Sequence, residues 1–383
     1  MNSSDSQGNS KPLFVGYPNV GDRKAFDELV DGIFERNWFT NNGVLVQQLE
    51  QTLSEYLGVK HCVLVCNATI GLQLVCQVLG LKGEVIVPAY TFVATAHAAH
   101  TLGLDVVFAD VLPDTHLIDP ISVEKLVNEK TAAIVGVHLW GNCCDVAKIS
   151  AIAEKHGIPH MYDAAHAFAC RHDGKSIGSF GLCEVFSFHA TKFFNTFEGG
   201  AITTDDDELA NNLRRSRNFG FNGPDSVVAL GTNAKMSEVC AAMGLANFPS
   251  VDKFINRNRE NHRLYVEGLA GVPGIRLLDY ANQERSNWQY IVIEIDAETF
   301  GHTRDELYEE LQKHQVLAKR YFKPGVHKME PYCSTQPKIS LDVTERLCEQ
   351  VLCLPNGCGI EGTDISRVCN VIRSMQRHGA SKE

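Results

Sequence analysis

The sequence lacks several patterns that mark common classes of protein. None of its 13 cysteines belongs to a Cys-x-x-Cys pair, and no His-Glu-x-x-His motif occurs among its 15 histidines. These absences argue against the usual zinc sites, because such sites need closely spaced thiolate or imidazole ligands. We therefore predict no metal site, and we interpret most of the cysteines as reduced, buried residues of a cytoplasmic protein.

The chain also has no excess of positive charge and no long apolar run. It has 35 lysine and arginine residues against 46 aspartate and glutamate residues, which gives a formal net charge of −11. An acidic chain is a poor partner for nucleic acid, whose phosphates attract basic surfaces. No run is long enough to span a bilayer, and the polar first ten residues lack the apolar core of a signal peptide. We expect neither nucleic acid nor a membrane as a partner.

Short apolar strands alternate with helices over the first part of the chain. Strands are predicted at 61–65, 84–88, 105–109, 132–137 and 159–163, with helices between them at 69–79, 91–102, 121–127 and 146–156. Continuous apolar strands are typical of a sheet covered on both faces, and repeated βα units make such a sheet mostly parallel. The sequence therefore predicts a doubly wound α/β domain with its ligand site at the carboxyl ends of the strands.

The pattern changes after Gly200, and a long helix is predicted from Met236 to about Leu269. Beyond it, strands are predicted at 288–295 and 316–320, and helices at 303–314, 344–351 and 364–375. We place a domain boundary in the long helix, because the elements after it are mixed rather than regular βα repeats. The expected organisation is a disordered tail at 1–11, a large domain at 12–250, and the long helix with a smaller α+β domain at 251–383.

One lysine, Lys192, stands between an apolar run at 184–186 and a predicted strand at 201–204. This position is unfavourable for a fully solvated charge. Burial lowers the pKa of a lysine, and an unprotonated amine can condense with an aldehyde to form a Schiff base. Lys192 alone is weak evidence, so its interpretation depends on what lies at the ends of the other strands.

Three further features follow predicted strands. The segment Asn67-Ala68-Thr69 opens a helix, whose free N–H groups and hydroxyl suit a phosphate, although an ordinary N-cap has the same pattern. The segment Pro88-Ala89-Tyr90-Thr91-Phe92 places an aromatic residue after the next strand, where its ring either stacks on a planar ligand or packs in the core. Asp163 ends a strand, where a buried carboxylate either keeps a ring nitrogen protonated or caps the next turn.

Two more residues complete this set of groups. His166 lies three residues after Asp163 and can hydrogen-bond a ring oxygen, and Ser187 supplies a second hydroxyl for a phosphate. A phosphate cradle, a stacking aromatic ring, a carboxylate for a ring nitrogen and a reactive lysine are the groups that pyridoxal phosphate requires.

The chain resembles the DegT/DnrJ/EryC1/StrS family of pyridoxal-phosphate-dependent nucleotide-sugar aminotransferases over roughly residues 14–375. The similar motifs are WFTNNG at 38–43, PAYTFVAT at 88–95, DAAH at 163–166, SFHATK at 187–192, RNFG at 217–220, MSE at 236–238 and YFKPGVH at 321–327. The resemblance implies the type I fold of aspartate aminotransferase, with a mostly parallel seven-stranded sheet domain and a smaller C-terminal α+β domain.

The resemblance also implies roles for particular residues. Lys192 would hold the cofactor covalently and move the proton, and Asp163 would pair with the pyridine nitrogen. The other cofactor contacts would be Ala68, Thr69 and Ser187 at the phosphate, Phe92 on the ring, His166 at the ring hydroxyl, and Asn233 reaching the phosphate in a neighbouring subunit. This last contact implies a homodimer with shared active sites. Substrate contacts would be Thr40, Asn41, Asn42, Arg320, Tyr321 and His327, of which the last three are also typical of an exposed loop.

Two positions depart from the family pattern. His166 stands where many relatives have glutamine, and Lys235 stands where many have arginine, which removes a bidentate contact there. The branch of the family that dehydrates its sugar has histidine in place of the lysine. The presence of Lys192 therefore favours transamination.

The motifs at 40–43, 189–192 and 194–196 are most similar to those of enzymes that act on dTDP-4-keto-6-deoxy-D-glucose. We therefore expect transfer of an amino group from L-glutamate to this sugar, which gives dTDP-4-amino-4,6-dideoxy-D-glucose. Open alternatives are a 3-aminotransferase for a dTDP-3-keto-6-deoxyhexose, an aminotransferase for another nucleotide-linked keto sugar, and a non-catalytic regulator that binds the cofactor or the sugar. An NAD-dependent sugar dehydrogenase is disfavoured, because no Gly-x-Gly-x-x-Gly follows the first predicted strand.

Overall fold

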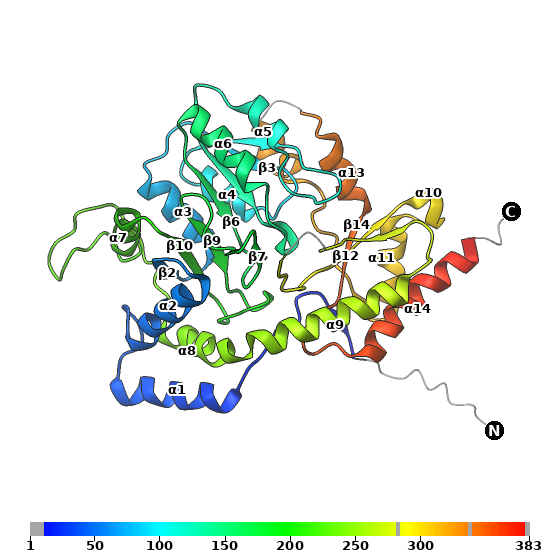
Figure 1. Cartoon of the computed structure of the whole chain (residues 1–383), viewed down its shortest axis with the longest axis horizontal. Helices are drawn as coiled ribbons and strands as arrows, with labels where there is room; N and C mark the ends of the chain where they lie inside the picture. Colours follow the sequence, from blue (N-terminus) through cyan, green and yellow to red (C-terminus); the bar gives the residue numbers. More distant parts are fainter. Residues whose placement is uncertain (1–10, 281–283, 336–338, 380–383) are drawn as a thin grey trace.

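A seven-stranded sheet forms the centre of the large domain (Figure 1). The structure is a computed structural model that describes residues 11–280, 284–335 and 339–379, so nearly all of the tail predicted at 1–11 lies outside the described residues. The sheet has the order β2-β10-β9-β6-β5-β3-β4. Its strands are β2 (His61–Val65), β3 (Glu84–Pro88), β4 (Asp105–Ala109), β5 (Thr131–Val137), β6 (His160–Asp163), β9 (Glu184–Ser187) and β10 (Gly200–Thr204).

Six of these strands run in one direction, and β10 is antiparallel to both of its neighbours. The predicted α/β class with a mostly parallel seven-stranded sheet is therefore confirmed. The helices of this domain are α1 (Arg23–Arg36), α2 (Val44–Leu57), α3 (Ala68–Val78), α4 (Ala94–His100), α5 (Pro120–Leu126), α6 (Val146–His156), α7 (Asp207–Ser216) and α8 (Glu238–Asn247).

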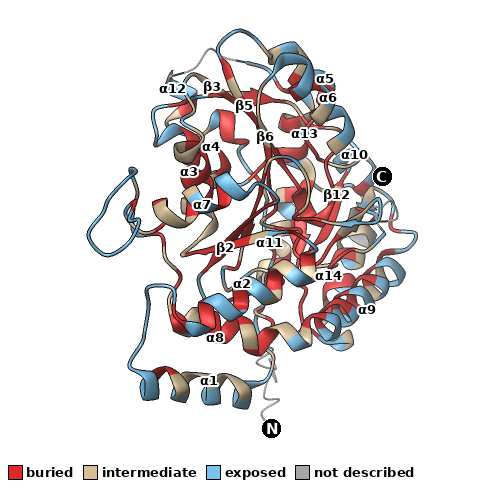
Figure 2. Cartoon of the chain, turned by 60° about the vertical axis from the view of Figure 1, so that its left-hand side comes forward, coloured by how far each residue is buried: buried red, intermediate tan, exposed pale blue. Residues whose placement is uncertain are grey.

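The strands are continuous apolar runs because both faces of the sheet are covered (Figure 2). Successive side chains of a strand point to opposite faces. In β2, Val63 and Val65 join a core cluster with residues of α3, α4 and α7, whereas Cys62 and Leu64 join a second cluster with residues of α2 and α8. The helices therefore form a layer on each side of the sheet, and only its edges are available for a site.

The helix predicted from Met236 to Leu269 is two helices, so the prediction of one continuous helix is wrong. α8 ends at Asn247, a 3₁₀ turn covers Phe248–Ser250, and α9 (Val251–Leu269) begins after it. Pro249 lies in this turn, and proline interrupts a helix because it lacks an N–H and clashes with the preceding turn. α9 then runs beside α14 (Gly362–Gly379) at the base of the molecule (Figure 1).

The smaller domain is built on a three-stranded antiparallel sheet of β11 (Ile275–Leu277), β12 (Ile291–Ile295) and β14 (Val351–Leu354). Its helices are α10 (Ala297–Phe300), α11 (Arg304–Lys313), α12 (Tyr332–Thr335), α13 (Asp342–Gln350) and α14. Short pairs join β1 (Leu13–Phe14) to β13 (Val316–Leu317) and β7 (Arg171–His172) to β8 (Lys175–Ser176). Sequence analysis missed β14 because α13 passes into it at Val351 without a turn residue.

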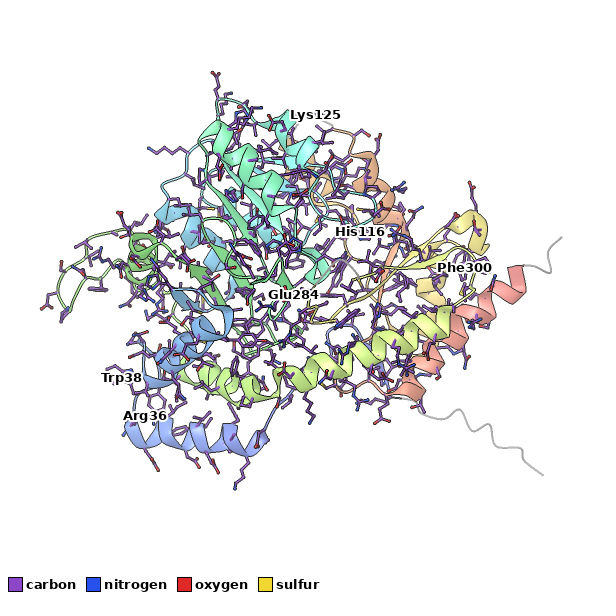
Figure 3. The ribbon with its side chains drawn as sticks, in the orientation of Figure 1. Arg36, Trp38, His116, Lys125, Glu284 and Phe300 are labelled. Atoms are coloured by element: carbon purple, nitrogen blue, oxygen red, sulfur yellow. The ribbon has the colours of Figure 1, made fainter. Side chains whose placement is uncertain are left out.

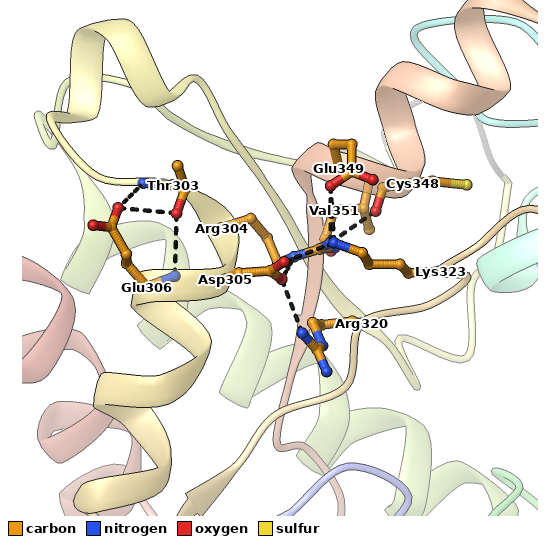
Figure 4. Close-up of polar contacts among 9 residues, drawn as sticks. All are labelled: Thr303, Arg304, Asp305, Glu306, Arg320, Lys323, Cys348, Glu349 and Val351. Atoms are coloured by element: carbon orange, nitrogen blue, oxygen red, sulfur yellow. Dashed lines mark hydrogen bonds and ion pairs between the residues drawn. The ribbon is translucent and has the colours of Figure 1, made fainter.

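A buried arginine joins the elements of the smaller domain (Figure 4). Arg304, at the start of α11, donates from Nη1 to the carbonyl oxygen of Val351 at 2.7 Å and from Nη2 to that of Cys348 at 2.8 Å. Its Nε donates to Asp305 Oδ1 at 2.7 Å. One planar guanidinium therefore satisfies the end of α13, the start of β14 and a carboxylate at the same time.

The described part of the chain gives no helix with both the length and the apolar character that a bilayer crossing requires. Within the same residues, no three histidine, cysteine, aspartate or glutamate side chains form a group that could hold a metal ion. All 13 cysteines lie in the described ranges, and each is a free thiol.

The Arg304 contacts predict a loss of stability on a charge-conserving substitution. In Arg304→Lys, a single ammonium group cannot reach both carbonyl oxygens and the carboxylate, so a buried acceptor loses its donor. We expect the free energy of unfolding to fall by about 2–3 kcal/mol, measured by urea denaturation. Arg263→Lys, on the exposed face of α9, is the matched control and should leave the urea midpoint unchanged. Equal midpoints for both variants would contradict this assignment.

Candidate active site

Residues of four predicted site segments stand at one edge of the central sheet. Because β2, β3, β6 and β9 are parallel, the start of α3, the loop with Phe92, Asp163 and Ser187 follow carboxyl ends that lie together. β10 enters the sheet at this edge. Its first residue, Gly200, is in register with Ser187 on one side and with Val65 on the other.

The first turn of α3 and Gly200 form a cradle. Asn67 caps the helix, as the N-cap interpretation expects, but its Oδ1 accepts only the N–H of Ile70, at 2.9 Å. Among the described residues, the amides of Ala68 and Thr69 have no acceptor. A Cβ at Gly200 would lie 2.8 Å from the Ala68 nitrogen, so glycine leaves this space open. Free amides at the start of a helix suit an anion such as phosphate.

Asp163 is a buried carboxylate at the end of β6. Its Oδ2 accepts the hydroxyl of Thr95 at 2.8 Å, and its Oδ1 accepts the N–H of Ala165 at 3.0 Å. Burial raises the pKa of Asp163, while these two hydrogen bonds and the charge of Lys192 oppose that rise. Each oxygen can still accept a further hydrogen bond. Sequence analysis missed Thr95, because a threonine on a short helix carries no signal that it will meet a carboxylate from another strand.

Lys192 stands on a loop whose backbone is held in place by buried neighbours. Phe193 and Phe194 are buried beside it. Asn19 Nδ2 donates to the carbonyl oxygen of Phe193 at 2.9 Å, and Asn195 Nδ2 donates to that of Asn19 at 2.8 Å. These reciprocal amide bonds fix the loop on both sides of the aromatic pair, so Lys192 projects from an ordered segment.

The Lys192 side chain is half-buried, and the pKa of its amine is lowered. Burial lowers the pKa of Lys192 to about 8, against the opposing effect of the Asp163 carboxylate. No hydrogen bond holds this amine within the described residues. An amine with this pKa is unprotonated in about one molecule in ten at pH 7, whereas an ordinary lysine amine is unprotonated far more rarely. Lys192 therefore has the character of a nucleophile.

Phe92 and His166 differ sharply in exposure. Phe92 is 56% exposed, which excludes the interpretation of this ring as core packing. His166 is 7% exposed, and its Nδ1 accepts the backbone N–H of Trp140 at 3.3 Å. Burial lowers the pKa of His166 well below its ordinary value, and the charge of Lys192 acts in the same direction. His166 is therefore a neutral imidazole.

The predicted substrate residues before α2 form an exposed turn. Asn41 and Asn42 both have left-handed backbones, with φ of 60° and 57°, a conformation that asparagine tolerates better than most residues. Asn42 Oδ1 accepts a hydrogen bond from Arg217 Nη2 at 2.8 Å, which fixes the turn against the large domain. Thr40 precedes them and is exposed. A role for these three residues in binding a substrate stays a prediction.

Arg320 and His327 have partners of their own in the structure. Arg320 Nη1 donates to Asp305 at 3.1 Å, as Figure 4 shows, and its guanidinium lies 4.2 Å from the ring centre of Tyr308. His327 is buried, with its Nε2 3.5 Å from Glu345 Oε1. The interpretation of His327 as an exposed loop residue is therefore excluded, and a substrate contact by either residue stays a prediction.

Tyr321 is linked to the candidate cofactor residues by a chain of ring contacts. Its ring stacks on Trp140, with the ring centres 6.3 Å apart, and its carbonyl oxygen accepts the hydroxyl of Tyr90 at 2.5 Å. Trp140 in turn contacts His166. The described contacts thus bring Tyr321 close to the candidate cofactor residues, unlike the other two residues predicted in its segment.

Asn233 lies in the loop between α7 and α8, which projects from the body of the molecule (Figure 1). Its side chain is exposed, and its backbone pairs with that of Asn218. Lys235, which replaces the arginine of many relatives, donates to Asn218 Oδ1 at 2.9 Å and lies over the ring of Phe219. Asn233 thus lies where the two ends of this loop pair, and its contact to another subunit stays a prediction.

A model of the DegT/DnrJ/EryC1/StrS aminotransferase family matches residues 21–373. The chain belongs to this family. It is 37% identical over 366 residues to a dTDP-4-amino-4,6-dideoxy-D-glucose transaminase of Shigella dysenteriae. The aligned residues are 96% of this chain and 100% of that protein. A protein of the same name from Escherichia coli is 36% identical over 352 residues, which are 91% of this chain and 94% of the relative.

Solved structures of family members have the same fold. The crystal structure of DesI in the presence of its TDP-sugar product superposes with a TM-score of 0.93 at 46% identity, and the match covers 97% of this chain and 95% of that one. The type I fold is thereby confirmed, as is the prediction that this family member is a pyridoxal-phosphate-dependent aminotransferase.

The pKa of Lys192 predicts how the amine reacts with pH. In cofactor-free enzyme treated with pyridoxal phosphate and cyanoborohydride, the rate of labelling at Lys192 should rise about fivefold from pH 7 to 8, because the unprotonated fraction rises. It should rise less than about twofold from pH 8 to 9. Mass spectrometry of the Lys192 peptide measures this rate, with Nα-acetyl-lysine as the reference amine. A rate that climbs about tenfold per pH unit up to pH 10 would show an ordinary lysine.

Proposed function

We propose that this aminotransferase transfers the amino group of L-glutamate to dTDP-4-keto-6-deoxy-D-glucose and releases dTDP-4-amino-4,6-dideoxy-D-glucose. The names of the two relatives at 37% and 36% identity support this sugar, as does the product named for the structural relative at 46% identity. The observation that carries the chemistry is the placement of Lys192, an amine with a pKa of about 8, within the electrostatic influence of the buried carboxylate of Asp163.

The residues at this edge of the sheet fit pyridoxal phosphate. The cradle beside Gly200 suits its phosphate, the unpartnered amine of Lys192 suits its aldehyde, and the buried carboxylate of Asp163 suits its ring nitrogen. The exposed ring of Phe92 suits stacking on a planar group. When bound, this cofactor supplies an aldehyde carbon and a ring that delocalises the electrons of a broken C–H bond.

Each residue of the candidate site then has a defined task. The amides of Ala68 and Thr69 and the hydroxyl of Ser187 would bind the phosphate, and the Asp163 carboxylate would keep a proton on the ring nitrogen. Lys192 Nζ removes the proton from the α-carbon of glutamate in the first half-reaction. In the second half-reaction it delivers a proton to the sugar carbon that receives the nitrogen.

The experiment described below also distinguishes this function from other sugar substrates and from a non-catalytic role. A 3-keto sugar or another nucleotide would use the same Lys192 and Asp163, so the relatives' names carry the choice of sugar. A regulator that binds without turnover has no need of an amine with a lowered pKa. We therefore place catalysis first and treat sugar identity as the variable to measure.

The first test is the donor half-reaction. The purified protein should carry a visible absorbance band of bound cofactor, and anaerobic L-glutamate without sugar should bleach it as the amino group is transferred. Lys192→Ala should still bind the cofactor and show no turnover, because it lacks the group that moves the proton. A screen of dTDP, UDP and GDP keto sugars, with NMR of the product, then identifies the acceptor. A band that glutamate leaves unchanged would contradict this donor.

A homodimer with shared sites follows from the same proposal. The loop that carries Asn233 also exposes apolar side chains, among them Leu230 at 77%, Val227 at 60% and Val228 at 55%. Neighbouring exposed apolar side chains favour a surface that another protein covers. We assign this surface to a second copy of the chain, whose cofactor phosphate Asn233 would reach.

Asn233→Ala should weaken cofactor retention about tenfold, because a phosphate loses a hydrogen bond to the neighbouring subunit. Equilibrium dialysis measures this, with Asn222→Ala in the same loop as the matched control. Mixing the Lys192→Ala and Asn233→Ala proteins provides a further test, since each hybrid dimer should regain one intact site. Unchanged retention in Asn233→Ala, or no regain of activity on mixing, would contradict the shared site without affecting the chemistry.

A further inference from the structure

Two bulky buried residues with left-handed backbones contact each other beside the site. His116 has a φ of 63° and Trp140 a φ of 61°, and their side chains are 1% and 0% exposed. Histidine adopts this conformation more often than most residues, but for a residue as bulky as Trp140 it persists only where the surroundings enforce it. Trp140 Nε1 donates to His116 Nδ1 at 3.1 Å. The mechanism derived above uses neither residue, so the strain at both positions has no explanation in it.

Trp140 contacts His166 in two ways. Its backbone N–H donates to His166 Nδ1 at 3.3 Å, and its indole stacks on the imidazole with ring centres 5.7 Å apart at 27°. The angle φ sets the direction of an N–H relative to its own side chain. The left-handed backbone therefore lets one residue direct its N–H to His166 while its indole N–H reaches His116.

The hydrogen bonds fix the protons on both histidines. An indole N–H only donates, so His116 Nδ1 is an acceptor and its proton lies on Nε2, which is 2.8 Å from Glu294 Oε1 on β12. By the same argument, the N–H of Trp140 places the proton of His166 on Nε2. His166 Nε2 has no acceptor among the described residues, although His166 itself is more than nine-tenths buried.

His166 Nε2 is not one of the fully enclosed polar atoms that lack a partner, so this donor faces accessible space that a ligand oxygen can enter. We propose that Trp140, held by His116 and Glu294, is a positioning residue that fixes His166 with its Nε2–H directed at the ring hydroxyl oxygen of the cofactor. This inference rests on the cofactor of the proposed function. It extends that function to the smaller domain, because Glu294 belongs to that domain and His116, labelled in Figure 3, lies at the boundary between the two.

The test is the pH midpoint of the absorbance change of the bound cofactor. A fixed donor at the ring oxygen withdraws negative charge from it and so lowers the midpoint. Trp140→Phe keeps the stacked ring and loses only the bond to His116, so we expect the midpoint to rise by about 0.5 pH unit, a threefold change in proton affinity. His116→Ala should give the same rise, and the double variant should add nothing to it.

Two backgrounds separate positioning from a merely structural effect. In the His166→Ala protein, Trp140→Phe should leave the midpoint unchanged, because the group that it positions is gone. Trp288→Phe is the matched control: Trp288 is also left-handed, with a φ of 54°, and its ring contacts His262 and Tyr280 instead of His166. This control should keep the wild-type midpoint.

The outcomes distinguish this inference from the proposed function. A wild-type protein without a cofactor band would overturn the proposed function. A wild-type band with a normal titration, but with the same midpoint in Trp140→Phe and His116→Ala, would overturn the positioning role alone. An equal shift in the His166→Ala background would also overturn it. If Trp140→Phe does not fold, His116→Ala decides by itself.

Discussion

Loss of hydration at the carboxyl ends of the central strands is the physical effect on which the site depends. It lowers the pKa of Lys192 to about 8, lowers that of His166 and raises that of Asp163. All three changes favour the neutral form, because a charge in this place has exchanged water for protein. Under the proposed function, a protonated ring nitrogen would favour the charged form of Asp163, because it would supply the cationic partner that a buried carboxylate lacks. The same loss of hydration thus favours the reactive, neutral amine of Lys192 and would favour pairing of the Asp163 carboxylate with a cationic ring nitrogen.

The fold maintains this environment by fixing the loops that leave the sheet. The hydroxyl of Thr95 joins the loop after β3 to Asp163 at the end of β6, and the amides of Asn19 and Asn195 hold the backbone beside Lys192. The smaller domain contributes from the other side, through Glu294 and the segment of Tyr321. The site is therefore a product of both domains, although all the groups assigned to the cofactor within this chain come from the larger one.

The sequence predicted the sheet well for a physical reason. Strands at 61–65, 84–88 and 105–109 were bounded correctly, because a strand buried on both faces must be continuously apolar and must end at a turn. Asp163 and Lys192 stood out because charged residues interrupt such runs. Thr95 and Trp140 did not, since their roles arise from contacts between segments far apart in the chain. The break at Pro249 was a signal present in the sequence, and the prediction of one continuous helix overlooked it.

The choice of histidine at position 166 has a structural requirement that glutamine would not have. A glutamine amide donates at any pH, whereas an imidazole is a neutral donor at Nε2 only if Nδ1 is occupied as an acceptor. Burial alone gives a neutral ring without deciding which nitrogen holds the proton. The N–H of Trp140 decides it, and that N–H is directed by a backbone conformation that His116 and Glu294 stabilise. A histidine here therefore requires a set of partners reaching into the second domain, so docking of that domain and the protonation of His166 are linked in this chain.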